Sequence, residues 1–172
     1  MAKPISERPV DLFYRTFFSV MIVISLVADC SPLYPEWLRP AFVSNMHKYQ
    51  FDTFKDPFFN FAIHRPWFES LVWLELLVLV PFSAWLIHGL TVDHPLVPLH
   101  LLMYAYHMGV TTIPCLAEIY QEKMLSTSEV AKLFGMYGPF VILPVYMIYD
   151  AYGRIRKQLL GAHDRDIVAK AK

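Results

Sequence analysis

One apolar segment, residues 67–90, limits what this chain can fold into more than any other part of the sequence. It reads WFESLVWLELLVLVPFSAWLIHGL, and beyond Glu69 its only formal charge is Glu75. As a helix rising about 1.5 Å per residue, it reaches roughly 36 Å, enough to cross a hydrocarbon core of about 30 Å. A charge inside such a span costs at least about 2.5 to 3.5 kcal/mol. Glu75 is therefore expected to be neutral, paired with another group or part of a functional site.

The composition agrees with a membrane protein. The 172 residues are 56% hydrophobic and only 17% charged, whereas a soluble domain carries about 25% charged residues. Fifteen basic residues balance fifteen acidic ones, and no basic patch or motif indicates a nucleic-acid partner. Cys30 and Cys115 match no zinc or redox spacing. No metal or cofactor is predicted, and we interpret the two cysteines as free core thiols, with a disulfide between them left open.

Four apolar segments predict an all-α membrane protein, a four-transmembrane-helix bundle within residues 10–153. Residues 1–9 are polar and expected to be disordered, and residues 154–172 form a polar tail. Prolines inside the apolar segments are expected to kink the helices, because proline removes a backbone donor. The predicted spans are residues 10–29, 67–92, 95–120 and 130–152.

The first loop, residues 30–66, is polar but rich in aromatic side chains. Residues 40–53 have apolar side chains near helical spacing, which predicts a short amphipathic helix on the bundle or the membrane interface. Four spans put both termini on one side, which holds nine basic residues against six on the other. This bias predicts that both termini are cytosolic and that the first loop is lumenal.

Asp29 and Glu75 are the acids whose positions suggest a common site. Asp29 ends the first span, and Glu75 lies two to three turns into the second span, counted from the same side. Two close carboxyl groups in a low dielectric cannot both ionise cheaply, so the pair would carry one negative charge. Such a pair in an aromatic cavity suits a cationic amine with an apolar body. The alternatives are that Asp29 is an interfacial cap and that Glu75 makes a packing hydrogen bond.

Asp56 and a polar stripe on the third span are further candidates. Pro57 forces an extended backbone at Asp56, which leaves the carboxylate free to cap backbone N–H groups, so we interpret Asp56 as structural. The stripe follows helical spacing on one face, which predicts either a cavity lining or contacts that hold helices together. Its members are His100, Tyr104, His107, Thr111, Pro114 and Glu118.

The order of these motifs resembles the sigma-2 receptor family of the endoplasmic reticulum, part of the EXPERA group that includes emopamil-binding protein. The resemblance covers roughly residues 10–153. It rests on Asp29, Phe54-Lys55-Asp56-Pro57, Trp67-Phe68-Glu69-Ser70 with Glu75-Leu76 and Pro81, His107 with Thr111 and Pro114, and Tyr137-Gly138-Pro139 with Pro144.

The resemblance implies a lumen-facing pocket that takes sterols, oxysterols or cationic amphiphilic amines from the bilayer. It implies that Asp29 pairs with a ligand amine, that Glu75 holds a proton and bonds to Asp29, and that Asp56 braces the pocket. A second copy of this chain, forming a homodimer, is a further partner that we expect. The expected ligand-binding residues are Asp29, Glu75, Tyr49, Phe54, Tyr104, His107, Thr111 and Tyr137, and the expected supporting residues are Asp56, Pro57, Pro81, Pro114 and Pro139.

Two departures from the family pattern bear on ligand preference. Gln50 stands where the family has a pocket tyrosine, and Leu79 stands where it has a glutamine. The resemblance implies a role in sterol traffic or in quality control of mitochondrial precursor proteins, in the endoplasmic reticulum membrane. The alternative is a sterol isomerase, but isomerases resemble a pattern with histidine one turn before the glutamate, where this chain has Leu71. A non-enzymatic binding protein is therefore favoured.

Overall fold

Helices make up the regular structure of residues 4–60 and 63–170, which are the parts of the chain that the computed structural model describes, and no strand occurs among them. Short 3-10 turns, η1 (Ile5–Glu7), η3 (Ser31–Leu33), η4 (Glu36–Leu38) and η5 (Pro57–Phe59), lie in the connecting segments. The α-helices are α1 (Pro9–Ile24), α2 (Ala41–Phe54), α3 (Pro66–Leu74), α4 (Val80–Val92), α5 (Val97–Gln121), α6 (Thr127–Tyr137) and α7 (Pro139–Lys170).

Three helical segments of the described chain are long and apolar enough to cross a membrane: Pro9–Asp29, Pro66–Val92 and Thr127–Arg165. They correspond to the first, second and fourth predicted spans. The third predicted span is present as the 25-residue helix α5, but its polar stripe lowers its hydropathy and it is not one of the three. The protein is thus all-helical in the described residues, with three candidate spans, and a fourth span stays a prediction.

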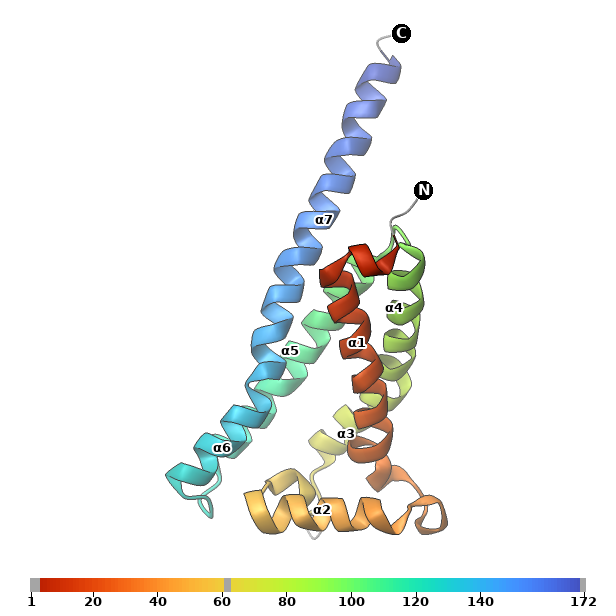
Figure 1. Cartoon of the computed structure of the whole chain (residues 1–172). Helices are drawn as coiled ribbons and strands as arrows, with labels where there is room; N and C mark the ends of the chain where they lie inside the picture. Colours follow the sequence, from red (N-terminus) through yellow and green to blue (C-terminus); the bar gives the residue numbers. More distant parts are fainter. Residues whose placement is uncertain (1–3, 61–62, 171–172) are drawn as a thin grey trace.

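The long helices pack in two pairs. α1 lies along α4, and α5 lies along α7, whereas the contacts between the pairs are fewer. In Figure 1 the two pairs meet near the end that carries both termini and diverge toward the opposite end, where α2 runs across the base. The second half of α7 continues past the other helices on the side of the termini (Figure 1).

Two separate apolar cores hold this arrangement. The larger one joins both pairs near the termini, with Tyr14 and Phe18 of α1 packed among buried residues of α4, α5 and α7. The smaller one lies near α2 and contains Phe58, Cys115, Ile119 and Leu133. Because the pairs diverge between these cores, space remains there that side chains do not fill.

Two π-helical turns interrupt the first two candidate spans. The turn η2 (Ser25–Asp29) follows α1, and the turn η6 (Glu75–Leu79) joins α3 to α4. Pro81 lies two residues after η6, in the first turn of α4, and it cannot donate a backbone hydrogen bond. The π turn before Pro81 adds one residue to the helical turn and so changes which side chains of the helix face inward. The proline kinks predicted from the sequence stay predictions, because what the structure adds at this position is the π turn.

The amphipathic helix of the first loop is α2, close to the predicted residues 40–53. It ends at Lys55, which adopts a left-handed conformation with φ 57°.

Near the N-terminus, the structure differs from the expected disorder of residues 1–9. Ile5–Glu7 form η1, and Arg8 is held by ion pairs to Asp11 and Asp93; residues 1–3 lie outside the described part.

Candidate functional site

A central cavity of about 340 Å³ lies between the two helix pairs. Side chains from α1, η2, α2, η5, α3, η6, α5, α6 and α7 line it, and most of them are apolar or aromatic. A volume in this range suits a small organic ligand, for which sites are mostly apolar with a few convergent polar groups. The polar groups therefore decide what the cavity can recognise.

The two acids predicted to meet, Asp29 and Glu75, both line the cavity. Asp29 is the last residue of η2 and Glu75 is the first of η6, and these two π turns contact each other. The two carboxyl groups lie close enough to interact electrostatically. The hydroxyl of Ser25, which is buried, donates to Glu75 Oε1 at 2.5 Å. π turns of this kind occur often at functional sites, and here two of them bring the acids together.

Asp56 anchors a second polar group at the α2 side of the cavity. Its side chain is fully buried and accepts hydrogen bonds from Phe58 N at 3.0 Å, Tyr137 Oη at 3.0 Å and Gln50 Nε2 at 3.3 Å. Burial is the largest influence and raises the pKa of Asp56, against the lowering effect of these hydrogen bonds and of Arg65. Asp56 thus connects α2, η5 and α6 and holds Gln50 and Tyr137 at the cavity wall.

His47 fastens α2 to the end of the first candidate span. Its Nε2 lies 3.0 Å from the carbonyl oxygen of Ala28 and 3.1 Å from Ser31 Oγ. The ring is buried, and this burial lowers the pKa of His47. A neutral imidazole can donate one N–H to the carbonyl, so α2 is held one residue away from Asp29.

The polar stripe on α5 divides among three environments. Tyr104, His107 and Thr111 line the cavity, which agrees with the interpretation of the stripe as a lining. His100 lies elsewhere, stacked on Trp85 with ring centroids 3.7 Å apart. Glu118 pairs with Arg65 at 3.3 Å, so this end of the stripe ties α5 to the start of α3.

Tyr49 and Phe54 are the predicted ligand-binding residues that the structure does not bring to the cavity. Tyr49 is 61% exposed and packs edge-on against Phe54, with ring centroids 6.3 Å apart. Gln50, the next residue on α2, lines the cavity in place of Tyr49. Of the predicted supporting prolines, Pro57 is buried beside Asp56, whereas the side chains of Pro81, Pro114 and Pro139 are exposed and act on the backbone only.

Sequence reasoning missed several residues that build the site. Ser25 was not singled out, although a serine one turn before Asp29 in an apolar run is a usable signal. Gln50 and Leu79, noted only as departures from the family pattern, both line the cavity. Cys115 lines it as well. Cys30 and Cys115 are free and buried, as interpreted, and burial raises the pKa of Cys30 to about 12.

The comparisons with known proteins agree with these features. A model of the EXPERA family, the expanded EBP superfamily, matches residues 41–151. The chain is 27% identical over 163 residues to Efficient mitochondria targeting-associated protein 19 of Schizosaccharomyces pombe, an alignment that covers 92% of this chain and 84% of that protein. It is 24% identical over 146 residues to Sigma intracellular receptor 2 of Xenopus tropicalis, covering 80% of this chain and 84% of the relative.

Replacing Asp56 by alanine should cost stability rather than ligand selectivity. The substitution removes the acceptor of three donors, and a buried donor without a partner costs about 1 to 3 kcal/mol. We expect Asp56→Ala to lower the thermal unfolding midpoint of the purified protein clearly. Asp52→Ala, which removes an exposed carboxylate of the same region, should leave the midpoint unchanged. If Asp56→Ala unfolds like the wild type and only loses ligand, Asp56 recognises ligand directly.

Proposed function

This chain belongs to the EXPERA family, and from that membership we propose that it is an intramembrane binding protein for sterols, oxysterols and cationic amphiphilic amines. The proposal includes no catalytic step. It places the protein in the endoplasmic reticulum membrane, acting in sterol traffic or in quality control of mitochondrial precursor proteins.

The observation that carries the proposal is the acid pair in the wall of an otherwise apolar cavity. Asp29 and Glu75 both line the cavity and lie close enough to interact, and Ser25 donates to Glu75. Two adjacent carboxyl groups in a low dielectric share a proton, because two charges there would repel each other. The pair therefore offers one negative charge to a ligand ammonium group, while the aromatic and aliphatic lining takes the apolar body.

Neutral ligands need a different anchor, and His107 supplies it. His107 lines the cavity from α5 and is half-buried, and no hydrogen bond to its ring occurs among the described residues. By contrast, the hydroxyl of Thr111 already donates to the backbone carbonyl of His107 at 3.0 Å. A sterol hydroxyl can therefore be recognised by the imidazole without displacing an existing bond.

The names of the two relatives support the biological part of the proposal. One relative is named for efficient mitochondrial targeting and the other as an intracellular receptor. A cavity that binds a lipid-like ligand within a helical membrane protein is compatible with both names. The two roles differ in what binds this chain in cells: a sterol ligand for sterol traffic, and a client precursor protein for quality control.

The alternative is a sterol isomerase, because the EXPERA group also contains such an enzyme. Isomerisation needs an acid that protonates one ring carbon and a base that removes a proton from another. Leu71, one turn before Glu75, is the position where isomerases have histidine, and this leucine lines the cavity. We expect that expression of this chain does not restore sterol isomerisation in a yeast strain lacking the isomerase, measured by sterol profiling. Restoration would show that the protein is an enzyme.

The topology proposed here has four spans, with α5 crossing beside α7 and both termini in the cytosol. α5 is long enough to cross a hydrocarbon core of about 30 Å at about 1.5 Å per residue, and the middle of its polar stripe lines the cavity. A glycosylation acceptor inserted near Ser44 should be modified, because the first loop is then lumenal, and one inserted after Gly161 should not. The gel shift after glycosidase treatment measures this, and the reverse pattern would invert the orientation.

The decisive test of the ligand proposal is a pair of isosteric substitutions. Asp29→Asn keeps the shape of the side chain and removes the charge, so we expect binding of a cationic amphiphile to weaken about tenfold or more. Glu75→Gln should have a milder effect, because glutamine, like protonated glutamic acid, can donate a hydrogen bond to Asp29. Binding of an oxysterol should change less in Asp29→Asn. Radioligand binding to membranes measures all three quantities.

Asp52→Asn serves as the control for this experiment, since it neutralises an exposed carboxylate outside the cavity. Equal loss of amine and oxysterol binding in Asp29→Asn would mean that Asp29 shapes the cavity and is not a counter-ion. Unimpaired amine binding in that variant would rule out the ion pair with the ligand.

A further inference from the structure

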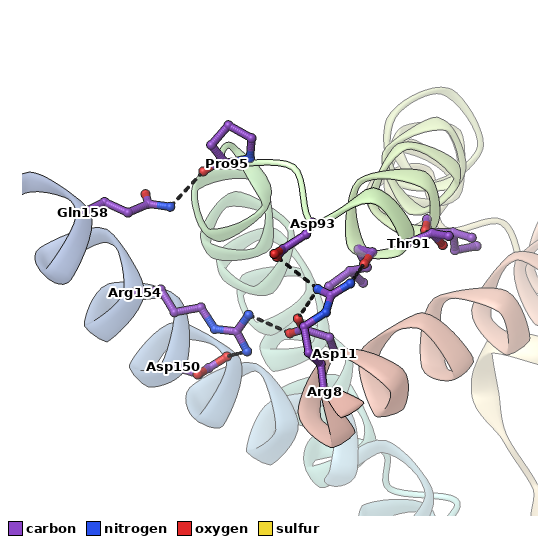
Figure 2. A network of polar contacts seen from close by, with 10 residues as sticks. Arg8, Asp11, Thr91, Asp93, Pro95, Asp150, Arg154 and Gln158 are labelled. Atoms are coloured by element: carbon purple, nitrogen blue, oxygen red, sulfur yellow. Dashed lines mark hydrogen bonds and ion pairs between the residues drawn. The ribbon is translucent and has the colours of Figure 1, made fainter. Parts of the chain in front are cut away.

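A cluster of charged side chains joins the two helix pairs at the end that carries both termini (Figure 2). We call it the Asp11 cluster; its members are Arg8, Asp11, Asp93, Asp150 and Arg154. It lies at the opposite end of the bundle from α2, and none of its members lines the central cavity. Its role is therefore separate from ligand recognition.

Asp11 is the centre of this cluster. Asp11 is buried, at 4% exposure of the residue, and its carboxylate is shared between two guanidinium groups, with Arg8 Nη1 at 2.6 Å from Oδ2 and Arg154 Nη1 at 2.6 Å from Oδ1. Arg154 also pairs with Asp150 at 2.9 Å. Charge-assisted bonds of this length are among the stronger hydrogen bonds in proteins, so Asp11 holds α1 and α7 together.

The same cluster reaches the turn between α4 and α5. Arg8 donates to Asp93 Oδ1 at 3.1 Å and to the carbonyl oxygen of Leu90 at 2.7 Å. Beside it, Gln158 Nε2 of α7 donates to the carbonyl oxygen of Pro95 at 3.1 Å. Figure 2 shows the labelled side chains approaching from the start of α1, from the connection between α4 and α5, and from α7. The cluster thus fastens the α1–α4 pair to the α5–α7 pair at one end only.

A continuous line of contacts leads from the cluster to the cavity. Tyr14, one turn beyond Asp11, donates its hydroxyl to Asp150 Oδ2 at 3.2 Å. Phe18, one turn further along α1, packs edge-on against Tyr104 of α5, with ring centroids 4.8 Å apart. Tyr104 lines the cavity. Packed side chains thus link the cluster to the cavity wall.

The surroundings of the cluster let it open. A second hollow, of about 390 Å³, is lined by Arg8, Asp11, Asp93 and Arg154 among others. Removing a partner from a buried ion pair is strongly unfavourable where water is excluded. Here the hollow allows water to solvate the separated charges, which lowers that cost.

We propose that the Asp11 cluster is a clasp that sets the separation of the two helix pairs and so controls access to the central cavity. With the clasp closed, the pairs are held together beside the larger core, and the cavity keeps the partly open form of this structure. With the clasp open, the pairs separate and the opening of the cavity widens. The proposal concerns access alone and does not depend on which ligand the cavity binds.

The two native cysteines allow a direct test. Cys115 lines the cavity, whereas Cys30 is fully buried and does not. The intact protein is treated with N-ethylmaleimide under native conditions. Mass spectrometry then measures the rate of alkylation at each of the two cysteines. We expect Asp11→Asn to raise the Cys115 rate about fivefold or more and to leave the Cys30 rate nearly unchanged. Cys30 therefore reports general loosening, and Cys115 reports opening of the cavity.

Two further variants complete the experiment. Arg154→Lys keeps the positive charge, but one ammonium group cannot reproduce the fork that bridges Asp11 and Asp150. It should therefore raise the Cys115 rate in the same direction by less, and it keeps the test available if Asp11→Asn does not fold. Glu69→Gln removes the partner of His64 in an exposed ion pair and should change neither rate. Unchanged Cys115 alkylation in both cluster variants, or equal acceleration at Cys30 and Cys115, would overturn the proposal.

Discussion

The cost of a carboxyl group in an apolar environment is the constraint on which the rest of this structure depends. Glu75 lies within a candidate membrane span, where an unpaired charge is expensive. It is stabilised by Ser25 and by Asp29, which come from the end of the neighbouring span. That arrangement requires two helices to approach each other at their π turns. The position of the first span against the second, and with it one wall of the cavity, follows from this requirement.

The cavity persists because the polar groups around it are occupied by one another and the apolar groups pack on either side of it. The larger core fills the space between both helix pairs near the termini, and the smaller core fills the space near α2. Between them, Asp56 braces Gln50 and Tyr137, and the acid pair braces η2 and η6. Collapse of the cavity would break these hydrogen bonds, and unpaired buried groups cost more than an unfilled apolar space of modest size.

Local sequence signals were sufficient for the elements and for part of the site. Three of the four predicted spans agree with helices long and apolar enough to cross a membrane, and α2 matches the amphipathic helix. The capping role of Asp56 followed from Pro57 and is confirmed by the bond to Phe58 N. The sequence could not show that Gln50 and not Tyr49 lines the cavity, because the choice between neighbouring positions on α2 depends on how the helix is rotated against the bundle. That rotation is set by His47 and Asp56 together, which lie on different segments.

Sequence by itself determined the helical class, the positions of the helices, and the fact that Glu75 needs a partner, because hydropathy and charge are properties of a segment. Only the tertiary structure decided that Ser25 joins Asp29 at Glu75, that Gln50 and not Tyr49 faces the cavity, and that Asp11 bonds arginines more than a hundred residues apart. A π turn adds one residue to a helical turn and changes which side chains face inward. Its location depends on neighbouring helices and prolines together, so periodicity in the sequence could not reveal it.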